Sequence, residues 1–184
     1  MSDLQLTFQR FDAAAARDAI DVVEQLYVAS HEEAIASGDP FRTTETFLHR
    51  FDRYTSTPAF DMVIAYESGQ AIGLAWGWPL RAGGTWWDGL LITDLGDDFT
   101  METGERTFAL SEIMVASAWE GRGVAHALHD ELLGARPEHR ATLLVSPTND
   151  RAYAAYKRWG WECVGQLRPG WPDAPTFDVL VRDL

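Results

Sequence analysis

The stretch Ser111–Ala125, SEIMVASAWEGRGVA, joins an apolar strand pattern to a helical pattern through two closely spaced glycines. Gly121 and Gly123 have no Cβ, so the backbone N–H groups at this junction can turn toward one point. The helix that begins there adds its own unpaired N–H groups and the positive end of its dipole. The junction is therefore a candidate anion site, best suited to phosphate or pyrophosphate.

Two familiar phosphate-binding motifs do not fit this junction. A P-loop needs G-x-x-x-x-G-K-[ST], which the sequence lacks. A dinucleotide-binding fingerprint needs Gly or Ala at the position that His126 occupies, and it also needs consecutive βα units that the first half of the chain does not offer. Arg122 and His126 would add positive charge here. A tight structural turn stays the alternative for the Gly-x-Gly pattern taken alone.

The periodicity of the whole chain predicts one α/β domain over residues 1–184 with a mixed sheet. Residues 81–105 interrupt the pattern with Gly, Trp and acidic residues, and we interpret them as an insertion on the substrate side. The tight-turn signal Glu67-Ser68-Gly69-Gln70 predicts a hairpin. The predicted strands are 4–9, 60–67, 70–80, 106–116, 141–146, 161–168 and 176–182, and the predicted helices are 13–36, 43–55, 122–134 and 149–159.

Two motifs, in this order along the chain, carry a family resemblance. The residues from Glu120 to Ala125 resemble the acetyl-CoA signature of the GNAT family of N-acetyltransferases, [Q/R]-x-x-G-x-[G/A], although Glu120 stands where Gln or Arg is usual. The segment Asn149–Trp161 is similar to a second stretch of that family, N-x-x-A-x-x-x-Y-x-[K/R]-x-G-aromatic. The resemblance covers residues 106–168, and the strand order of the whole chain is compatible with it.

The resemblance implies a single GNAT-like domain whose sheet of about seven strands splays between the strands at 106–116 and 141–146, flanked by about four helices. It implies acetyl-CoA as co-substrate, with its pantetheine arm paired to the strand before the glycines and its pyrophosphate held by the backbone after that strand. The Asn149 side chain would hold the pantetheine amides. The expected acetyl-CoA-binding residues are Ile113, Met114, Val115, Gly121, Arg122, Gly123, Val124, Ala125, His126 and Asn149.

Glu112 is a candidate general base. It alternates with Leu110 and Met114, which directs its side chain toward an apolar interior. A carboxylate there is costly unless it is paired or useful, and desolvation raises its pKa toward that of a working base. A salt bridge to an arginine is the alternative. Further candidates for the base are Asp88, Asp94 and Asp178.

Tyr156 is a candidate general acid. It shares a predicted helix face with Ala152, Ala155 and Trp159, so its side chain points inward. By the resemblance, its hydroxyl protonates the departing thiolate. The alternative is a half-buried tyrosine that uses its ring for packing.

Charge and aromatic content bear on the acceptor. The net charge of −13 argues against nucleic acid or an anionic membrane as partner, since both reward a basic face. It suits a cationic small molecule, with solubility as the alternative explanation. Tryptophans flank the acidic insertion, which favours an amine-bearing acceptor. The expected substrate-binding residues are Trp76, Trp78, Trp87 and Asp88.

No metal is expected. Cys163 is the single cysteine, so the chain has neither an internal disulfide nor a clustered-Cys metal site, and we expect its side chain to be buried. His126 and His129 are one turn apart, but no third ligand is indicated, and we interpret them as facing solvent. The lack of a leader pattern or a long apolar run predicts a cytoplasmic protein.

These patterns together predict an acetyl-CoA-dependent N-acetyltransferase that acetylates the primary amine of a small cationic molecule by direct attack in a ternary complex. A non-catalytic acyl-CoA sensor is one alternative, and Tyr156 and Glu112 argue against it. A protein or peptide N-acetyltransferase is another, and the insertion at 81–105 argues against the open groove that it would need. A homodimer is compatible with all three functions.

Overall fold

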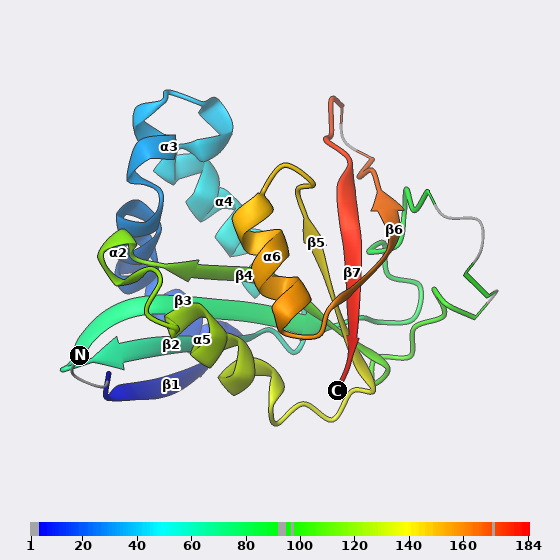
Figure 1. The fold of residues 1–184 in the computed structure, drawn as a ribbon, viewed down its shortest axis with the longest axis horizontal. Coiled ribbons are helices and arrows are strands. Elements are labelled where there is room, and N and C mark those ends of the chain that lie inside the picture. The colour runs from blue at the N-terminus through cyan, green and yellow to red at the C-terminus, as the bar shows by residue number, and fades with distance from the viewer. Residues whose placement is uncertain (1–3, 92–94, 97, 171) are drawn as a thin grey trace. The chain divides into compact units, whose positions relative to one another are not determined.

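The computed structural model, drawn as a ribbon in Figure 1, describes most of the chain. The described residues are 4–91, 95–96, 98–170 and 172–184. These residues form two compact units: the first unit lies within residues 1–78 and 112–135, and the second unit lies within residues 79–111 and 136–184. Strand β4 (Thr107–Val115) contributes its first half to the second unit and its second half to the first unit.

Seven strands form a mixed sheet in the order β1-β2-β3-β4-β5-β7-β6, which confirms the predicted α/β class. The strand bounds are Leu6–Asp12, Asp61–Glu67, Gln70–Pro79, Thr107–Val115, Arg140–Val145, Glu162–Leu167 and Phe177–Asp183, for β1 to β7. The described residues contain six α-helices rather than about four. Their bounds are Ala13–Asp18, Ile20–Ser30, Glu32–Ala36, Thr44–Thr55, Val124–Leu133 and Asp150–Arg158, for α1 to α6.

In the first unit, β1, β2 and β3 pair antiparallel and lie side by side (Figure 1). The predicted hairpin is confirmed, because Ser68 and Gly69 form a two-residue turn with φ of 50° and 80°. Helices cover both faces of these strands. On β3, Gly73 faces Leu128 of α5, whereas the alternate residue Trp76 faces the helices that precede β2.

The core on the Trp76 side is aromatic. Phe47 and Phe51 of α4 pack on Trp76, with ring centroids 6.1 Å and 5.3 Å from the Trp76 ring. The amphipathic pattern of residues 43–55 predicts this helix correctly, and the Thr43 side chain caps it by accepting from the Thr46 N–H. This packing holds α4 against the sheet face that carries Met114.

The single helix predicted over residues 13–36 is wrong, since the structure has three helices there, α1 to α3. The chain leaves helical geometry at Ala19 and at His31, where ψ is 15° and 23°. Neither break carries Gly or Pro. At the second break, the His31 ring stacks on Tyr27 and its Nδ1 lies 2.8 Å from the Ser30 hydroxyl. Side-chain contacts therefore stop the helix where the sequence has no breaker.

The second unit contains the other end of the sheet. In this unit, Thr107–Ala109 of β4 pairs in parallel with Arg140–Thr142 of β5. β7 pairs antiparallel with both β5 and β6. The described residues of 81–105 form turns, bends and one bridge, Leu90 to Leu167. No helix in the described ranges is long and apolar enough to cross a membrane.

Candidate active site

The glycine loop before α5 has the geometry of an anion site. Gly121 and Gly123 have φ of 72° and 84°, a left-handed conformation that other residues rarely adopt. A Cβ at either position would meet no atom of the described residues within 4 Å, so these residues leave the space above the loop open. α5 begins at Val124 without a side-chain cap, which leaves the N–H groups of its first turn for a ligand.

The residues around the loop are anchored within the first unit. The Arg122 guanidinium lies 5.1 Å from the centroid of the Trp119 ring, and both Arg122 and Glu120 are exposed. Behind the loop, Gly73 permits β3 and β4 to approach closely, since a Cβ there would lie 2.9 Å from the Met114 carbonyl oxygen. The strand that the resemblance assigns to pantetheine is thus held tightly at Met114.

Glu112 lies on β4 on the same side as Met114, and therefore on the α4 side of the sheet. Among the described residues, its carboxylate has no hydrogen bond and no cation within 4.0 Å. Burial raises the pKa of Glu112 to about 7, against the smaller opposing effect of the Arg50 and Arg42 charges. A carboxyl group with this pKa exchanges its proton near neutral pH, as a general base must.

Two of the predicted substrate-binding tryptophans lie on this side of the first unit. Trp78 is partly exposed and stacks on Tyr54, with ring centroids 5.3 Å apart. Trp76 is fully buried in the core behind it. Burial and then the Glu112 charge raise the pKa of Tyr54, which places its hydroxyl within electrostatic reach of Glu112.

Sequence reasoning missed four polar residues near Glu112. His31, Arg42, Arg50 and Tyr54 come from the helical region before β2, and each interacts electrostatically with Glu112 or with its neighbours. Burial lowers the pKa of His31, and both arginines add to that effect. The sequence does hold a signal for two of these residues: Arg50 and Tyr54 are four residues apart, which places them on one side of α4 beside its buried aromatic face.

The second unit holds Asn149 and Tyr156, at the start and near the end of α6. The Asn149 carboxamide oxygen caps this helix by accepting from the Ala152 N–H at 3.2 Å. The Tyr156 ring packs edge-on against Trp159 and Trp161, at centroid distances of 5.6 Å and 6.0 Å. The assigned roles of Asn149 on pantetheine and of Tyr156 as an acid stay predictions.

Trp87 and Asp88 also belong to the second unit. Trp87 is 8% exposed, and its Nε1–H donates to Glu102 at 2.9 Å, so its indole is part of the internal packing. Asp88 is exposed. Of the other candidate bases, Asp178 accepts a hydrogen bond from Gln166 at 3.0 Å, and Asp94 lies outside the described residues.

The expected burial of Cys163 is wrong. Its side chain is exposed on β6, not buried, because the register of β6 against β7 shifts between Cys163 and Gly165. The Cys163 thiol donates to the Gly165 carbonyl oxygen at 3.7 Å, and it is the first cause of a raised pKa at Tyr153.

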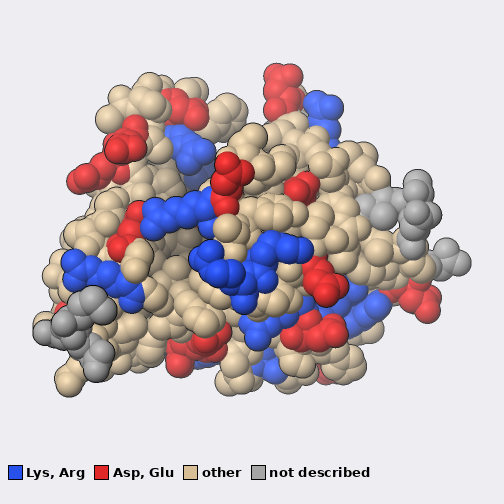
Figure 2. Space-filling view, in the orientation of Figure 1, with Lys and Arg blue, Asp and Glu red and all other residues tan. Residues whose placement is uncertain are grey.

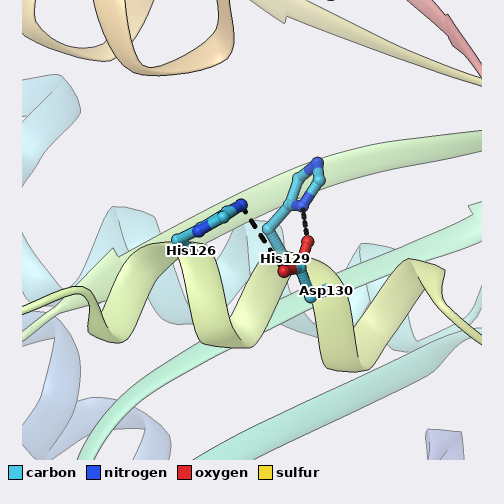
Figure 3. Close-up of side chains that lie close together, drawn as sticks. All are labelled: His126, His129 and Asp130. Carbon is cyan, nitrogen blue, oxygen red and sulfur yellow. Dashed lines mark hydrogen bonds and ion pairs between the residues drawn. The ribbon is translucent and has the colours of Figure 1, made fainter. Parts of the chain in front are cut away.

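The two histidines of α5 differ from each other. His126 is exposed as expected, but His129 is fully buried, because α5 buries a wide face that also includes Leu128 and Leu132. Figure 3 shows both imidazoles beside the Asp130 carboxylate, at 3.4 Å for His126 Nε2 and 2.8 Å for His129 Nδ1. The ligand atoms of the three residues lie within 4.8 Å of one another, so they could hold a metal ion.

The acidic net charge is unevenly distributed. On the face shown in Figure 2, basic side chains gather over the region of α6, whose last turn carries Lys157 and Arg158. Net charge alone therefore says little about the field that an acceptor meets at a particular site.

A family model described as "Acetyltransferase (GNAT) family" matches residues 21–161, which is more than half of the chain. Together with the seven-stranded mixed sheet and the glycine loop, this match defines an acyltransferase enzyme of a family that uses acetyl-CoA. The chain belongs to the GNAT acetyltransferase family, as its two motifs indicate. No curated protein matches the chain.

Solved structures share the fold at low sequence identity. An acetyltransferase from Thermus thermophilus has 17% identity and a TM-score of 0.65, with 100% of each chain covered. The ribosomal-protein-S18-alanine N-acetyltransferase from Escherichia coli has 13% identity and a TM-score of 0.62, with 97% of this chain and 94% of that chain covered. Aminoglycoside 6'-acetyltransferase type Ii has 15% identity and a TM-score of 0.62, with 96% of each chain covered. The names of the last two indicate different acceptors, so the fold does not decide the acceptor.

Proposed function

We propose that the chain transfers the acetyl group of acetyl-CoA to the primary amine of a small molecule, by direct attack within a ternary complex. The observation that carries this proposal is Glu112. Its carboxylate has no partner within the described residues, its pKa is raised to about 7, and it lies on the sheet face lined by Trp78 and Tyr54. A sensor that binds acyl-CoA without catalysis would not need a carboxylate of this kind.

The glycine loop supports binding of acetyl-CoA. The first-turn N–H groups of α5 and the open space above Gly121 and Gly123 suit a diphosphate. Arg122, resting on Trp119, can add positive charge, and Asn149 retains its NH₂ group for an amide carbonyl while its oxygen caps α6. When bound, acetyl-CoA supplies the acetyl group as a thioester.

Proton transfers complete the chemistry. Glu112 takes one proton from the acceptor ammonium and passes it to solvent, and the free amine then forms the N–C bond at the acetyl carbon while the C–S bond breaks. The nitrogen loses its second proton to solvent as the amide forms. Tyr156 gives its hydroxyl proton to the departing thiolate, and solvent restores it. Each transfer is of the kind that contributes roughly 10²–10⁴-fold to enzymatic rates.

The predicted acceptor contacts divide into two kinds. Trp78 is partly exposed on the Glu112 side, which supports a wall against the acceptor, and Trp76 backs that wall from the core. Asp88 is exposed in the second unit, whereas Trp87 is engaged with Glu102. The net charge of −13 favours a cationic acceptor, but Arg42 and Arg50 are the charges that act on Glu112. We therefore propose an acceptor that carries an amine, without assigning it a net positive charge.

The test measures release of free coenzyme A thiol with each member of a panel of small amines and of peptides with a free N-terminus. Tyr156→Phe is the matched variant. We expect thiol release with small amines, and a kcat in Tyr156→Phe lower by roughly 10²–10⁴ at an unchanged KM for acetyl-CoA. Binding of acetyl-CoA without thiol release on any acceptor would instead identify a sensor. Release with peptides alone would identify a peptide N-acetyltransferase.

A further inference from the structure

The side of the sheet that carries Glu112 also carries a cation without a carboxylate partner. Arg50 is partly buried on α4, one turn before Tyr54. Its Nη1 donates to the Phe41 carbonyl oxygen at 3.0 Å, which anchors one edge of the guanidinium. In the part of the chain that the structure describes, no carboxylate lies within 4.0 Å of Arg50.

An arginine of this kind needs an explanation in a chain with 28 acidic residues against 15 lysines and arginines. A guanidinium has five N–H donors, and the Phe41 carbonyl engages a single nitrogen. Leaving a partly buried charge without its counterion is costly unless a ligand supplies one. Arg50 therefore has unused capacity to bind an anion.

Further groups on the same side point to an anion as well. Among the described residues, Asp39 is the one carboxylate within 4.0 Å of Arg42, at 3.8 Å between exposed side chains, so the Arg42 charge is weakly compensated. Both arginines act on Glu112 and on His31, so each arginine lies within electrostatic reach of both groups. The Nε1–H of buried Trp76 has no acceptor among the described residues.

We propose that the acceptor is an amino-acid-like zwitterion, whose carboxylate is bound by Arg50 with the help of Arg42 while its amine faces Glu112. This inference rests on the proposed function. The planar guanidinium fork matches a carboxylate and binds it through two parallel hydrogen bonds. Trp78 and Tyr54 would contact the apolar part of the acceptor.

The competing explanation is that the arginines act on Glu112 alone, by favouring its ionised form. The two explanations differ in what Arg50 does to substrates that lack a carboxylate. If Arg50 acts only on Glu112, its loss affects all amines equally and moves the pH profile. If it binds the acceptor carboxylate, its loss affects acids and spares amines without one.

The test uses matched acceptor trios: phenylalanine, phenylalaninamide and phenethylamine, with the corresponding leucine and alanine trios. kcat/KM is measured by thiol release across pH and expressed per ammonium form of each acceptor, because Glu112 takes its proton from the ammonium. We expect the acid to be favoured over both analogues by roughly tenfold or more in at least one trio, because a desolvated charged hydrogen bond is lost without the carboxylate.

Well above pH 7, where Glu112 is ionised in both proteins, Arg50→Gln should raise KM for the acid by roughly tenfold or more and leave the decarboxylated amine nearly unchanged. Arg50→Lys, which keeps the charge but loses the fork, should lie between the two. Arg53→Gln is the matched control, because it removes an exposed arginine from the same helix. Melting temperatures of the variants establish that each one folds.

A binding measurement separates failure of this inference from failure of the proposed function. Calorimetry with N-acetylphenylalanine and N-acetylphenethylamine, and with the leucine and alanine pairs, needs no turnover. Acid-selective binding that Arg50→Gln abolishes would support the carboxylate site even if no acceptor released thiol, and the proposed function alone would then fail. Acetyl transfer with no preference for acids in any trio, or equal binding of each pair, would overturn the carboxylate site and leave the proposed function standing.

Discussion

Two glutamates, one in each unit, have opposite surroundings. In the second unit, the Glu102 side chain is 4% exposed, and its Oε1 accepts hydrogen bonds from Arg140 at 3.1 Å, Trp87 at 2.9 Å and Thr107 at 2.9 Å. In the first unit, Glu112 has neither a hydrogen bond nor a cation within 4.0 Å among the described residues. Both carboxyl groups are largely removed from water, but in the described part of the chain only the Glu102 carboxylate has hydrogen-bond donors and a cation beside it.

The difference separates a structural from a chemical use of the same residue type. Glu102 ties the segment 81–105 to β5, because its partner Arg140 also donates to the Phe99 carbonyl oxygen at 2.6 Å. Glu112 has no hydrogen bond or ion pair in the described part of the chain, and burial raises its pKa to about 7. A matched carboxylate stabilises a fold, whereas an unmatched one is available for proton transfer.

The largest expected effect is the loss of kcat/KM in the Glu112→Gln variant. We expect kcat/KM above neutral pH to fall by roughly 10²–10⁴, the range for a lost general base. Only the ionised carboxylate accepts a proton, so kcat/KM of the wild type should rise with pH through about 7 and then level off. Glu112→Gln should lack this rise. The pH profile of thiol release measures both effects.

The control for Glu112→Gln is Glu45→Gln, which changes an exposed glutamate of α4 and should leave the profile as it is. An acidic limb that persists in Glu112→Gln would assign the base to another residue, and Asp178 and Asp88 would be the next to replace.

Glu102→Ala should have the next largest effect, and on stability rather than on chemistry. It leaves Arg140, 10% exposed, without its carboxylate, and breaking a buried pair from one side typically costs about 3–5 kcal/mol. Urea unfolding measures the loss. Glu105→Ala removes an exposed glutamate of the same segment and should stay within about 0.5 kcal/mol of the wild type. If Glu102→Ala and Glu105→Ala lost similar amounts of unfolding free energy, Glu102 would have no structural role to set it apart from Glu112.

Gly123→Val should abolish stabilisation by acetyl-CoA, which amounts to about 2.7 kcal/mol at a concentration of 100 Kd. The variant strains a backbone with φ of 84° and places a branched side chain in the open space above the loop. Gly38→Val is the matched control, because Gly38 has φ of 76° and equally open surroundings. Thermal melting with and without acetyl-CoA should show the shift in Gly38→Val and none in Gly123→Val. A full shift in Gly123→Val would exclude the loop as the anion site.

Local sequence signals predicted the parts of this fold that depend on neighbouring residues. The β2–β3 hairpin follows from Ser68-Gly69, and the glycine loop follows from Gly121 and Gly123, whose positive φ angles the structure confirms. The predicted orientation of Glu112 followed from alternation along one strand. Its companions did not, because Arg42 and Arg50 precede it by more than sixty residues in the chain.

The errors have the same cause. His129 is buried because α5 covers one face of the sheet, and helical spacing alone does not say how wide that buried face is. Cys163 is exposed because β6 shifts register against β7. The helix break at His31 depends on contacts with Tyr27 and Ser30, in a stretch without Gly or Pro. Each is a tertiary effect that overrides a local pattern.

The smallest expected effect is the pH dependence of stability that Glu112 imposes. Its pKa is about 7 in the folded protein and 4.5 without perturbation, so the folded state holds its proton more tightly. The contribution of Glu112 to stability is therefore fully present below about pH 4.5 and is lost as the pH rises through about 7. Because the side chain keeps some exposure, we expect a change of about 1–2 kcal/mol. Glu112→Gln remains neutral at every pH, so its stability relative to the wild type should increase by that amount between about pH 5 and about pH 8. Urea unfolding of both proteins at the two pH values measures the difference, and Glu45→Gln should show none. A difference between Glu112→Gln and the wild type that stays constant with pH would mean that Glu112 is well solvated, and its contrast with Glu102 would then be one of hydrogen bonding alone.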